Sequence, residues 1–127
     1  MQDRPTAAEL LEAIGDLLEK AVLPGTRGPL RHPVRVAGNL CRILEREAEL
    51  GSELEAREVE ILRQLLGPAT GDDVRSLTAE LDRRLATEDD PEFQARAWRG
   101  LLEIVRGKLR IAKPGYDAYD FVAELPG

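Results

Sequence analysis

The residues best suited to chemistry gather in one short stretch, residues 27–42, which reads RGPLRHPVRVAGNLCR. It holds the only histidine of the chain, His32, and the only cysteine, Cys41, together with four arginines and no acidic residue. Side chains of these types could bind a metal, act as a nucleophile with its base, or hold an anion. The rest of the sequence decides which of the three is best supported.

Metal and nucleophile chemistry are poorly supported. One histidine and one cysteine are too few for a metal site. A hydrolase triad would have to use His32, but no serine stands in a recognisable nucleophile elbow. The chain also has no phosphate-binding glycine motif and no dinucleotide fingerprint. We therefore expect no catalytic residue, no metal and no cofactor, and we interpret Cys41 as a small buried apolar side chain.

Anion binding fits the stretch better. Pro33 suits the first turn of a helix, where unpaired amides and the helix dipole favour a negative charge. Arg31 and Arg35 stand close enough to add bidentate donors for a phosphate, a carboxylate or an acidic partner segment. Steps of four, three and four residues then place one polar stripe along the helix, formed by Arg35, Asn39, Arg42 and Arg46.

A structural interpretation stands beside this one. Arginines next to glutamate-rich helices form ordinary ion pairs, each of which contributes little at a surface. In that case His32 only hydrogen-bonds the start of its helix, and Asn39 hydrogen-bonds the backbone of a loop or of the tail.

Charge is segregated along the chain. No acid occurs in residues 20–44, which carry a charge of +5, or in residues 104–116, which carry +4, so the remainder carries −15 of a net charge of −6. The second segment could complement the negative end of a helix dipole, or it could join the first in one composite patch. The residues of this hypothetical anion or partner patch are Arg31, His32, Arg35, Asn39, Arg42, Lys108, Arg110 and Lys113.

Two helices are expected in the first 50 residues. A capping box at residues 6–9, TAAE, starts the first helix, and the loop at residues 23–29 ends it. The second helix starts near Pro33 and ends at Gly51. The apolar faces expected to be buried are Leu10, Ile14, Leu17, Leu18 and Ala21 on the first helix, with Glu12, Asp16 and Glu19 outside, and Val36, Ala37, Leu40, Ile43 and Leu44 on the second.

Three further helices are expected after Gly51. The third is capped by Ser52 and reaches Gly67, and the fifth starts at Pro91 behind Asp90 and stops before Pro114. Their apolar faces are Val59, Leu62, Leu65 and Leu66, then Val74, Leu77, Leu81 and Leu85, then Trp98, Leu101, Leu102, Val105 and Leu109. Some of the glycines inside these helices and the first two are expected to mark close helix–helix approaches; the glycines are Gly15, Gly38, Gly100 and Gly107.

These patterns predict an all-α protein, a compact bundle of about five helices formed as a single domain over residues 1–127. The aromatic tail, residues 116–127, is expected to dock on it. A pI of about 4.9 argues against nucleic-acid binding. No apolar run is long enough to span a membrane, and neither a signal peptide nor a disulfide is indicated, so we expect a cytoplasmic protein.

Three segments, MQDRPTAAELLEA, LRHPVRVAGNL and KLRIAKPGY, together resemble an uncharacterised bacterial family of small helical proteins that form a domain of unknown function. The resemblance places Arg31, Arg35, Val36, Ala37 and Asn39 in the family's central motif. The family's histidine falls where this chain has Pro33, so the resemblance assigns His32 no role. Its members are often encoded beside an acyl-CoA dehydrogenase and an aminoglycoside-phosphotransferase-like kinase, which implies a link to acyl-CoA or carboxylic-acid metabolism.

Two functions follow as hypotheses. The first is a non-catalytic accessory module that binds another protein, either one of those two enzymes or a second copy of itself as a homodimer. The alternative is a small-molecule binder, or a weak enzyme, that holds a phosphate, a carboxylate or an acyl-CoA at the arginine-rich start of the second helix. Because the sequence shows no recognisable catalytic motif, we favour the accessory module.

Overall fold

The computed structural model describes residues 3–68 and 71–115, and within those ranges the regular elements are all helical. The protein is therefore all-α, as expected. Its chain divides into two compact units, residues 1–51 and residues 52–127, which we call the N-terminal and C-terminal units and describe separately. The expectation of a single domain stays a prediction.

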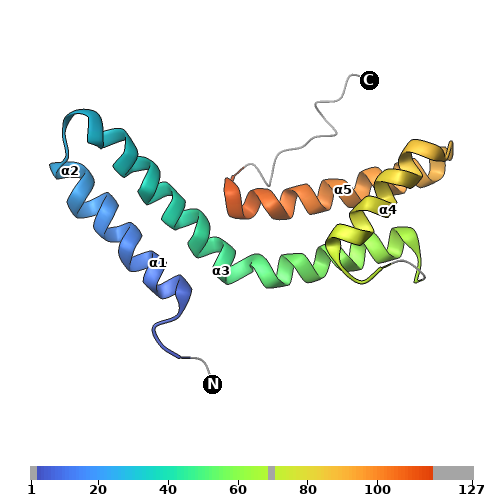
Figure 1. Ribbon diagram of the computed structural model, residues 1–127, viewed down its shortest axis with the longest axis horizontal. Coiled ribbons are helices and arrows are strands. Elements are labelled where there is room, and N and C mark those ends of the chain that lie inside the picture. Colours follow the sequence, from blue (N-terminus) through green and yellow to red (C-terminus); the bar gives the residue numbers. More distant parts are fainter. Residues whose placement is uncertain (1–2, 69–70, 116–127) are drawn as a thin grey trace. The chain divides into compact units, whose positions relative to one another are not determined.

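The N-terminal unit is a hairpin of two helices (Figure 1). Its first helical segment consists of α1 (Ala7–Asp16), a π-helical turn (Leu17–Val22) and α2 (Leu23–Gly25). The expected cap is confirmed, because the Thr6 Oγ1 accepts a hydrogen bond from the Glu9 amide at 3.2 Å. The segment extends through Leu23 and Pro24, which we expected to lie in the loop. Side-chain donors satisfy its last carbonyls: the Thr26 hydroxyl donates to the Val22 carbonyl at 2.6 Å.

The second helix of the hairpin, α3 (Arg31–Leu66), follows a 3₁₀ turn (Gly28–Leu30) and continues into the C-terminal unit. Pro33 lies in its first turn, as expected. The predicted break at Gly51 is wrong, so the described part of the chain has four long helical segments rather than about five. Glycine ends a helix when it adopts a positive φ, and Gly67 does so at +92° directly after α3, whereas Gly51 does not.

The C-terminal unit contains the rest of α3, α4 (Val74–Thr87) and α5 (Pro91–Ala112). The Asp90 carboxylate caps α5 by accepting from the Glu92 and Phe93 amides, as the sequence predicts. The three helices enclose a small apolar core, in which the buried side chains are Leu62, Leu77, Leu81, Phe93 and Ala97. Val59, Leu65, Leu66 and Leu85 pack against it, so the expected faces of residues 59–66 and 74–85 are largely confirmed.

The four helical glycines do mark close approaches. A Cβ atom at Gly100 would lie 2.9 Å from the Ile61 Cγ2, and one at Gly107 would lie 3.1 Å from the Leu54 Cδ2. The corresponding distances in the hairpin are 3.0 Å from Gly15 to the Arg42 Cζ and 3.1 Å from Gly38 to the Glu19 Cγ. Each glycine therefore lets its helix approach a side chain of the neighbouring helix.

The expected buried face of α5 is only partly correct. Trp98 and Val105 are 46% and 43% exposed, whereas Phe93 and Ala97 are buried instead. Leu101 packs against the core. The expected docking of the tail concerns residues that lie outside the described ranges. Within those ranges, no helix is both long and apolar enough to cross a membrane.

Candidate functional site

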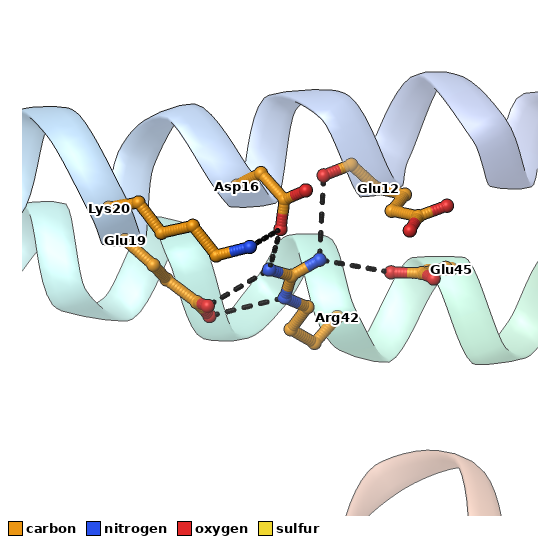
Figure 2. A network of polar contacts seen from close by, with 6 residues as sticks. All are labelled: Glu12, Asp16, Glu19, Lys20, Arg42 and Glu45. Atoms are coloured by element: carbon orange, nitrogen blue, oxygen red, sulfur yellow. Dashed lines mark hydrogen bonds and ion pairs between the residues drawn. The ribbon is translucent and has the colours of Figure 1, made fainter.

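A network of polar contacts centred on Arg42 joins the two helices of the hairpin (Figure 2). The Arg42 guanidinium reaches from α3 to the first helix, where Nη2 donates to the Asp16 Oδ1 at 2.6 Å. Two bonds, Nη2 to Oε2 at 2.9 Å and Nε to Oε1 at 3.2 Å, hold the Glu19 carboxylate in a bidentate pair. The Arg42 Nη1 donates to the Glu45 carboxylate at 3.3 Å and to the Glu12 backbone carbonyl at 3.4 Å. One side chain thus joins the two helices of the hairpin.

These contacts shift the protonation of the groups involved. Hydrogen bonds from Arg42, and then from Lys20, hold the pKa of Asp16 below its ordinary value. The hydrogen bond from Arg42 also lowers the pKa of Glu19. In return the carboxylates of Glu19 and Asp16 raise the pKa of Arg42. These shifts in pKa stabilise the charged forms of Asp16, Glu19 and Arg42, which suits a structural contact better than proton transfer.

The outer face of the first helix is apolar. Leu10, Ile14 and Leu17 recur at steps of four and three residues and are 49%, 48% and 57% exposed. Two side chains of the first helix bind Arg42 of α3, those of Asp16 and Glu19, and each lies two positions away from a member of this row. Two positions correspond to about 200° around a helix. The row, which we call the α1 row, therefore faces away from α3.

The outer face of α3 in the hairpin has the same arrangement. Val36, Leu40 and Leu44, which we call the α3 row, are 42%, 51% and 52% exposed. Gly38 and Arg42 meet the first helix, and they too alternate with the row at two-residue steps. The α3 row therefore faces away from the first helix.

These positions correct part of our expectation for the hairpin. We predicted that both apolar faces would be buried and that Glu12, Asp16 and Glu19 would point outside. Leu18, Ala37 and Ile43 are partly buried, but the other seven apolar residues of the two faces are exposed. Asp16 and Glu19 bind Arg42 across the hairpin through their carboxylates, whereas Glu12 is exposed and binds it only through its backbone carbonyl. Among the described residues of the N-terminal unit, only Gly15 and Gly38 are buried. The physical reason is Arg42, which can satisfy its donors only where the acids of the first helix face it.

The predicted patch residues of the hairpin divide into two groups. Arg42 lies in the network, and the Arg31 Nη1 donates to the Leu23 and Thr26 carbonyls at 2.9 and 3.2 Å. Both arginines thus hold the hairpin together. His32, Arg35 and Asn39 are exposed, and none of their three side chains forms an ion pair or hydrogen bond with another described residue.

The second basic segment lies in the C-terminal unit. The Lys108 Nζ pairs with the Glu58 carboxylate at 3.4 Å, and Arg110 is exposed. Lys113 caps α5 with its backbone amide, which donates to the Leu109 carbonyl at 2.7 Å. The composite patch with residues 31–42 stays a prediction. Within the described ranges no group of three or more histidine, cysteine or acidic residues could hold a metal ion.

Sequence reasoning missed a groove between α3 and α5 of about 380 Å³. Arg57 in this groove pairs with Glu60 at 3.1 Å and with Glu103 at 3.0 Å, which raises its pKa. Arg96 and Arg99 also line the groove, and neither forms an ion pair with a described residue. The remaining lining residues are Ile61, Gln64, Leu65 and Gly100. The three-residue spacing of Arg96 and Arg99 was the only signal in the sequence, and it is common on helices.

Comparisons with known proteins identify a family but no relative of known function. Comparisons with curated proteins and with solved structures found no match. A family model matches residues 24–116, a span that leaves out α1 and most of the segment with which the chain opens. The matched span includes all of α3, α4 and α5. The chain therefore belongs to the family described as Domain of unknown function (DUF6285).

Proposed function

We propose that this protein is a non-catalytic interaction module that docks an apolar helix face of another protein on its N-terminal hairpin. The observation that supports the proposal is the reversed hairpin. Six large apolar side chains, in two rows, point away from the polar contact that joins its helices. A solvent-exposed apolar row on a helix is typical of a protein–protein contact.

The energetics of such a contact are favourable. Complete burial of a leucine, isoleucine or valine side chain contributes about 1.5–3 kcal/mol, so covering the exposed half of each contributes about 1 kcal/mol. Burial of three such side chains is not enough for stable binding by itself, because association also costs translational and rotational entropy. The partner should therefore present an amphipathic helix that adds polar contacts at the edges of the row.

The partner we propose is one of two enzymes, an acyl-CoA dehydrogenase or an aminoglycoside-phosphotransferase-like kinase of the same bacterium. The resemblance described under the sequence supports this choice, because it implies that such enzymes are encoded beside members of the family. The module would then act in the cytoplasm on enzymes of acyl-CoA or carboxylic-acid metabolism, as an accessory rather than as a catalyst.

A pull-down with each purified enzyme tests the proposal. We expect the wild-type protein to retain one of them and the double variant Ile14→Glu/Leu17→Glu to lose it, because a charge in the α1 row cannot be buried against an apolar partner. Thr78→Glu adds a negative charge at an exposed position of α4 and serves as the control. Failure of the wild-type protein to retain either enzyme contradicts the proposed partners, and retention that survives the double change contradicts docking on the α1 row.

The α3–α5 groove favours a second candidate function, the binding of a small organic anion. Its volume lies within the range of ligand pockets, and two guanidinium groups without an ion pair stand beside apolar side chains. A carboxylate with a short apolar chain matches this combination, because guanidinium binds carboxylate in a bidentate manner. The alternative location is the start of α3, at Arg31 and Arg35.

A thermal-shift titration with hexanoate tests this candidate, with hexanol as the uncharged control. We expect only hexanoate to raise the melting temperature, because only a ligand of the folded state does so. Arg96→Gln/Arg99→Gln should abolish the shift if the groove is the site, and Arg31→Ala/Arg35→Ala should abolish it if the start of α3 is the site. Absence of a shift with the wild-type protein, or an equal shift with hexanol, contradicts anion binding.

A further inference from the structure

We infer that the groove between α3 and α5 binds the aromatic tail of the same chain, residues 116–127, which lies outside the described ranges. The inference goes beyond docking on the hairpin. It concerns the groove of the second candidate function and names an occupant that the chain itself carries, so the tail would compete with a small organic anion there. The groove and the tail both belong to the C-terminal unit.

The groove offers positive charge beside apolar side chains. Three arginines and one glutamate line it, which gives the lining a net charge of +2 in a protein of net charge −6. The glutamate, Glu103, accepts a hydrogen bond from Arg57 at 3.0 Å. Arg96 and Arg99 form no ion pair with a described residue, so their guanidinium groups are available to a carboxylate.

The tail has the complementary composition. Its three acidic residues are Asp117, Asp120 and Glu124, and it contains no lysine or arginine. It also holds three of the five aromatic residues of the chain. Guanidinium groups form bidentate pairs with carboxylates and stack on aromatic rings. A segment that combines carboxylates with aromatic rings therefore matches two arginines beside apolar side chains.

The tail is long enough to return to the groove. Arg99 and Arg96 stand thirteen and sixteen residues before Ala112, the last residue of α5, or about 20 and 24 Å along the helix. Asp120 follows Ala112 by eight residues, and an extended chain of this length spans up to about 26 Å. When the tail runs antiparallel to α5, Asp120 therefore reaches both arginines.

The chain turns directly before the tail. Lys113 is the C-cap of α5, and Pro114 and Gly115 form a turn after it. Gly115 has a φ of +102°, a conformation that glycine adopts readily in turns. A turn at this place is what a chain needs in order to run back along the helix that it has just left.

Cysteine cross-linking within one chain tests the contact. In a Cys41→Ser background, which removes the only native thiol, Gln64→Cys places a thiol in the groove. Ala118→Cys and Ala123→Cys, tested in turn, place the second thiol in the tail. We expect at least one of them to form a disulfide with Gln64→Cys about tenfold faster than with Thr78→Cys on α4, because a bound tail raises the effective concentration of its thiol in the groove.

Non-reducing gels and mass spectrometry separate the cross-linked monomer from dimers, and circular dichroism checks that each variant folds. Arg96→Gln/Arg99→Gln should abolish the preference for the groove. The matched control is Arg75→Gln/Arg110→Gln, which removes the same charge from exposed positions outside the groove and should preserve the preference.

Two results of the cross-linking would overturn the inference. Equal rates with Gln64→Cys and Thr78→Cys would mean that the tail does not bind in the groove. An equal loss of the preference in the two pairs of arginine variants would mean that the tail responds to positive charge in general rather than to the groove.

Hexanoate distinguishes this inference from the second candidate function. Because hexanoate must displace a bound tail, the variant Asp117→Asn/Asp120→Asn/Glu124→Gln should reach a given rise in melting temperature at a lower hexanoate concentration than the wild-type protein. A variant that needs as much hexanoate as the wild type contradicts competition by the tail. If the disulfide forms as expected but hexanoate stabilises neither protein, only the second candidate function fails. If hexanoate stabilises both but the disulfide shows no preference for the groove, only this inference fails.

Discussion

At the scale of single residues, Arg42 determines how the hairpin is built. Its side chain is 22% exposed and contacts three carboxylates and one backbone carbonyl. The other arginine of the hairpin connection, Arg31, binds carbonyls at the end of α2. Residues 27–42 thus contribute two arginines to the architecture of the hairpin and leave four exposed polar side chains for any ligand: Arg27, His32, Arg35 and Asn39.

Replacing Arg42 should destabilise the N-terminal unit in a pH-dependent way. The network lowers the pKa of Asp16 and Glu19 from ordinary values of 3.8 and 4.5. A lowered pKa means that the unfolded state binds protons more readily, so the stabilisation is complete above the ordinary values and is lost as the pH falls through the lowered ones. We expect Arg42→Met to lower the thermal midpoint by several degrees at pH 7, and the difference from the wild type to shrink in acid.

Circular dichroism melts of both proteins between pH 7 and pH 2 measure this difference. Asp73 and Glu80, whose pKa values are also lowered, belong to the C-terminal unit and contribute equally to both proteins. Arg42→Lys should restore only part of the midpoint, because an ammonium cannot form the bidentate pair with Glu19. A difference that does not change with pH would show that the network does not stabilise the hairpin.

At the scale of elements, two of the predicted helix caps are confirmed, whereas the predicted break at Gly51 and the predicted contact face of the hairpin helices are wrong. Thr6 and Asp90 could be predicted as caps because a cap depends on residues within one turn. The apolar periodicity also showed correctly which residues share a face of each hairpin helix. It could not show which face meets the other helix, because that depends on Arg42 finding Asp16 and Glu19, 26 and 23 residues earlier.

Gly51 illustrates the same limit within one helix. We expect Gly51→Ala to stabilise the protein by up to about 1 kcal/mol, because the residue lies inside α3, where alanine is preferred. An added Cβ would meet only the flexible end of the Glu47 side chain, at 2.7 Å. Gly67→Ala is the matched control and should destabilise, because φ is +92° at Gly67. Urea denaturation measures both, and a destabilised Gly51→Ala would indicate that α3 is broken there.

At the scale of the whole molecule, the buried apolar side chains of the described chain all lie in the C-terminal unit. Leu62 is 1% exposed, so Leu62→Ala should lower the free energy of unfolding by about 2–5 kcal/mol. Leu40 is 51% exposed, so Leu40→Ala should lower the free energy of unfolding of the monomer by less than about 1 kcal/mol. Denaturant unfolding at low protein concentration measures both, and equal costs would mean that Leu40 is buried in solution.

The fold class and much of the helical organisation could thus be predicted, whereas the candidate surfaces could not. Leu77 and Leu81 were assigned correctly to the core because a helix with one apolar stripe in a three-helix unit has only one place to bury it. The α1 and α3 rows are equally regular apolar stripes but stay about half exposed, because the contact between the two hairpin helices is formed by charged side chains such as Arg42 and Asp16.

Because the Arg42 network joins the two helices of the hairpin, the stability of the hairpin should depend on ionic strength. Added salt screens partly exposed ion pairs such as those of Arg42 with Asp16 and Glu19, so it should weaken the contact between the two helices. Apolar association is not weakened in this way, and sulfate strengthens it. Opposite sides of α3 should therefore respond in opposite directions to the same salt.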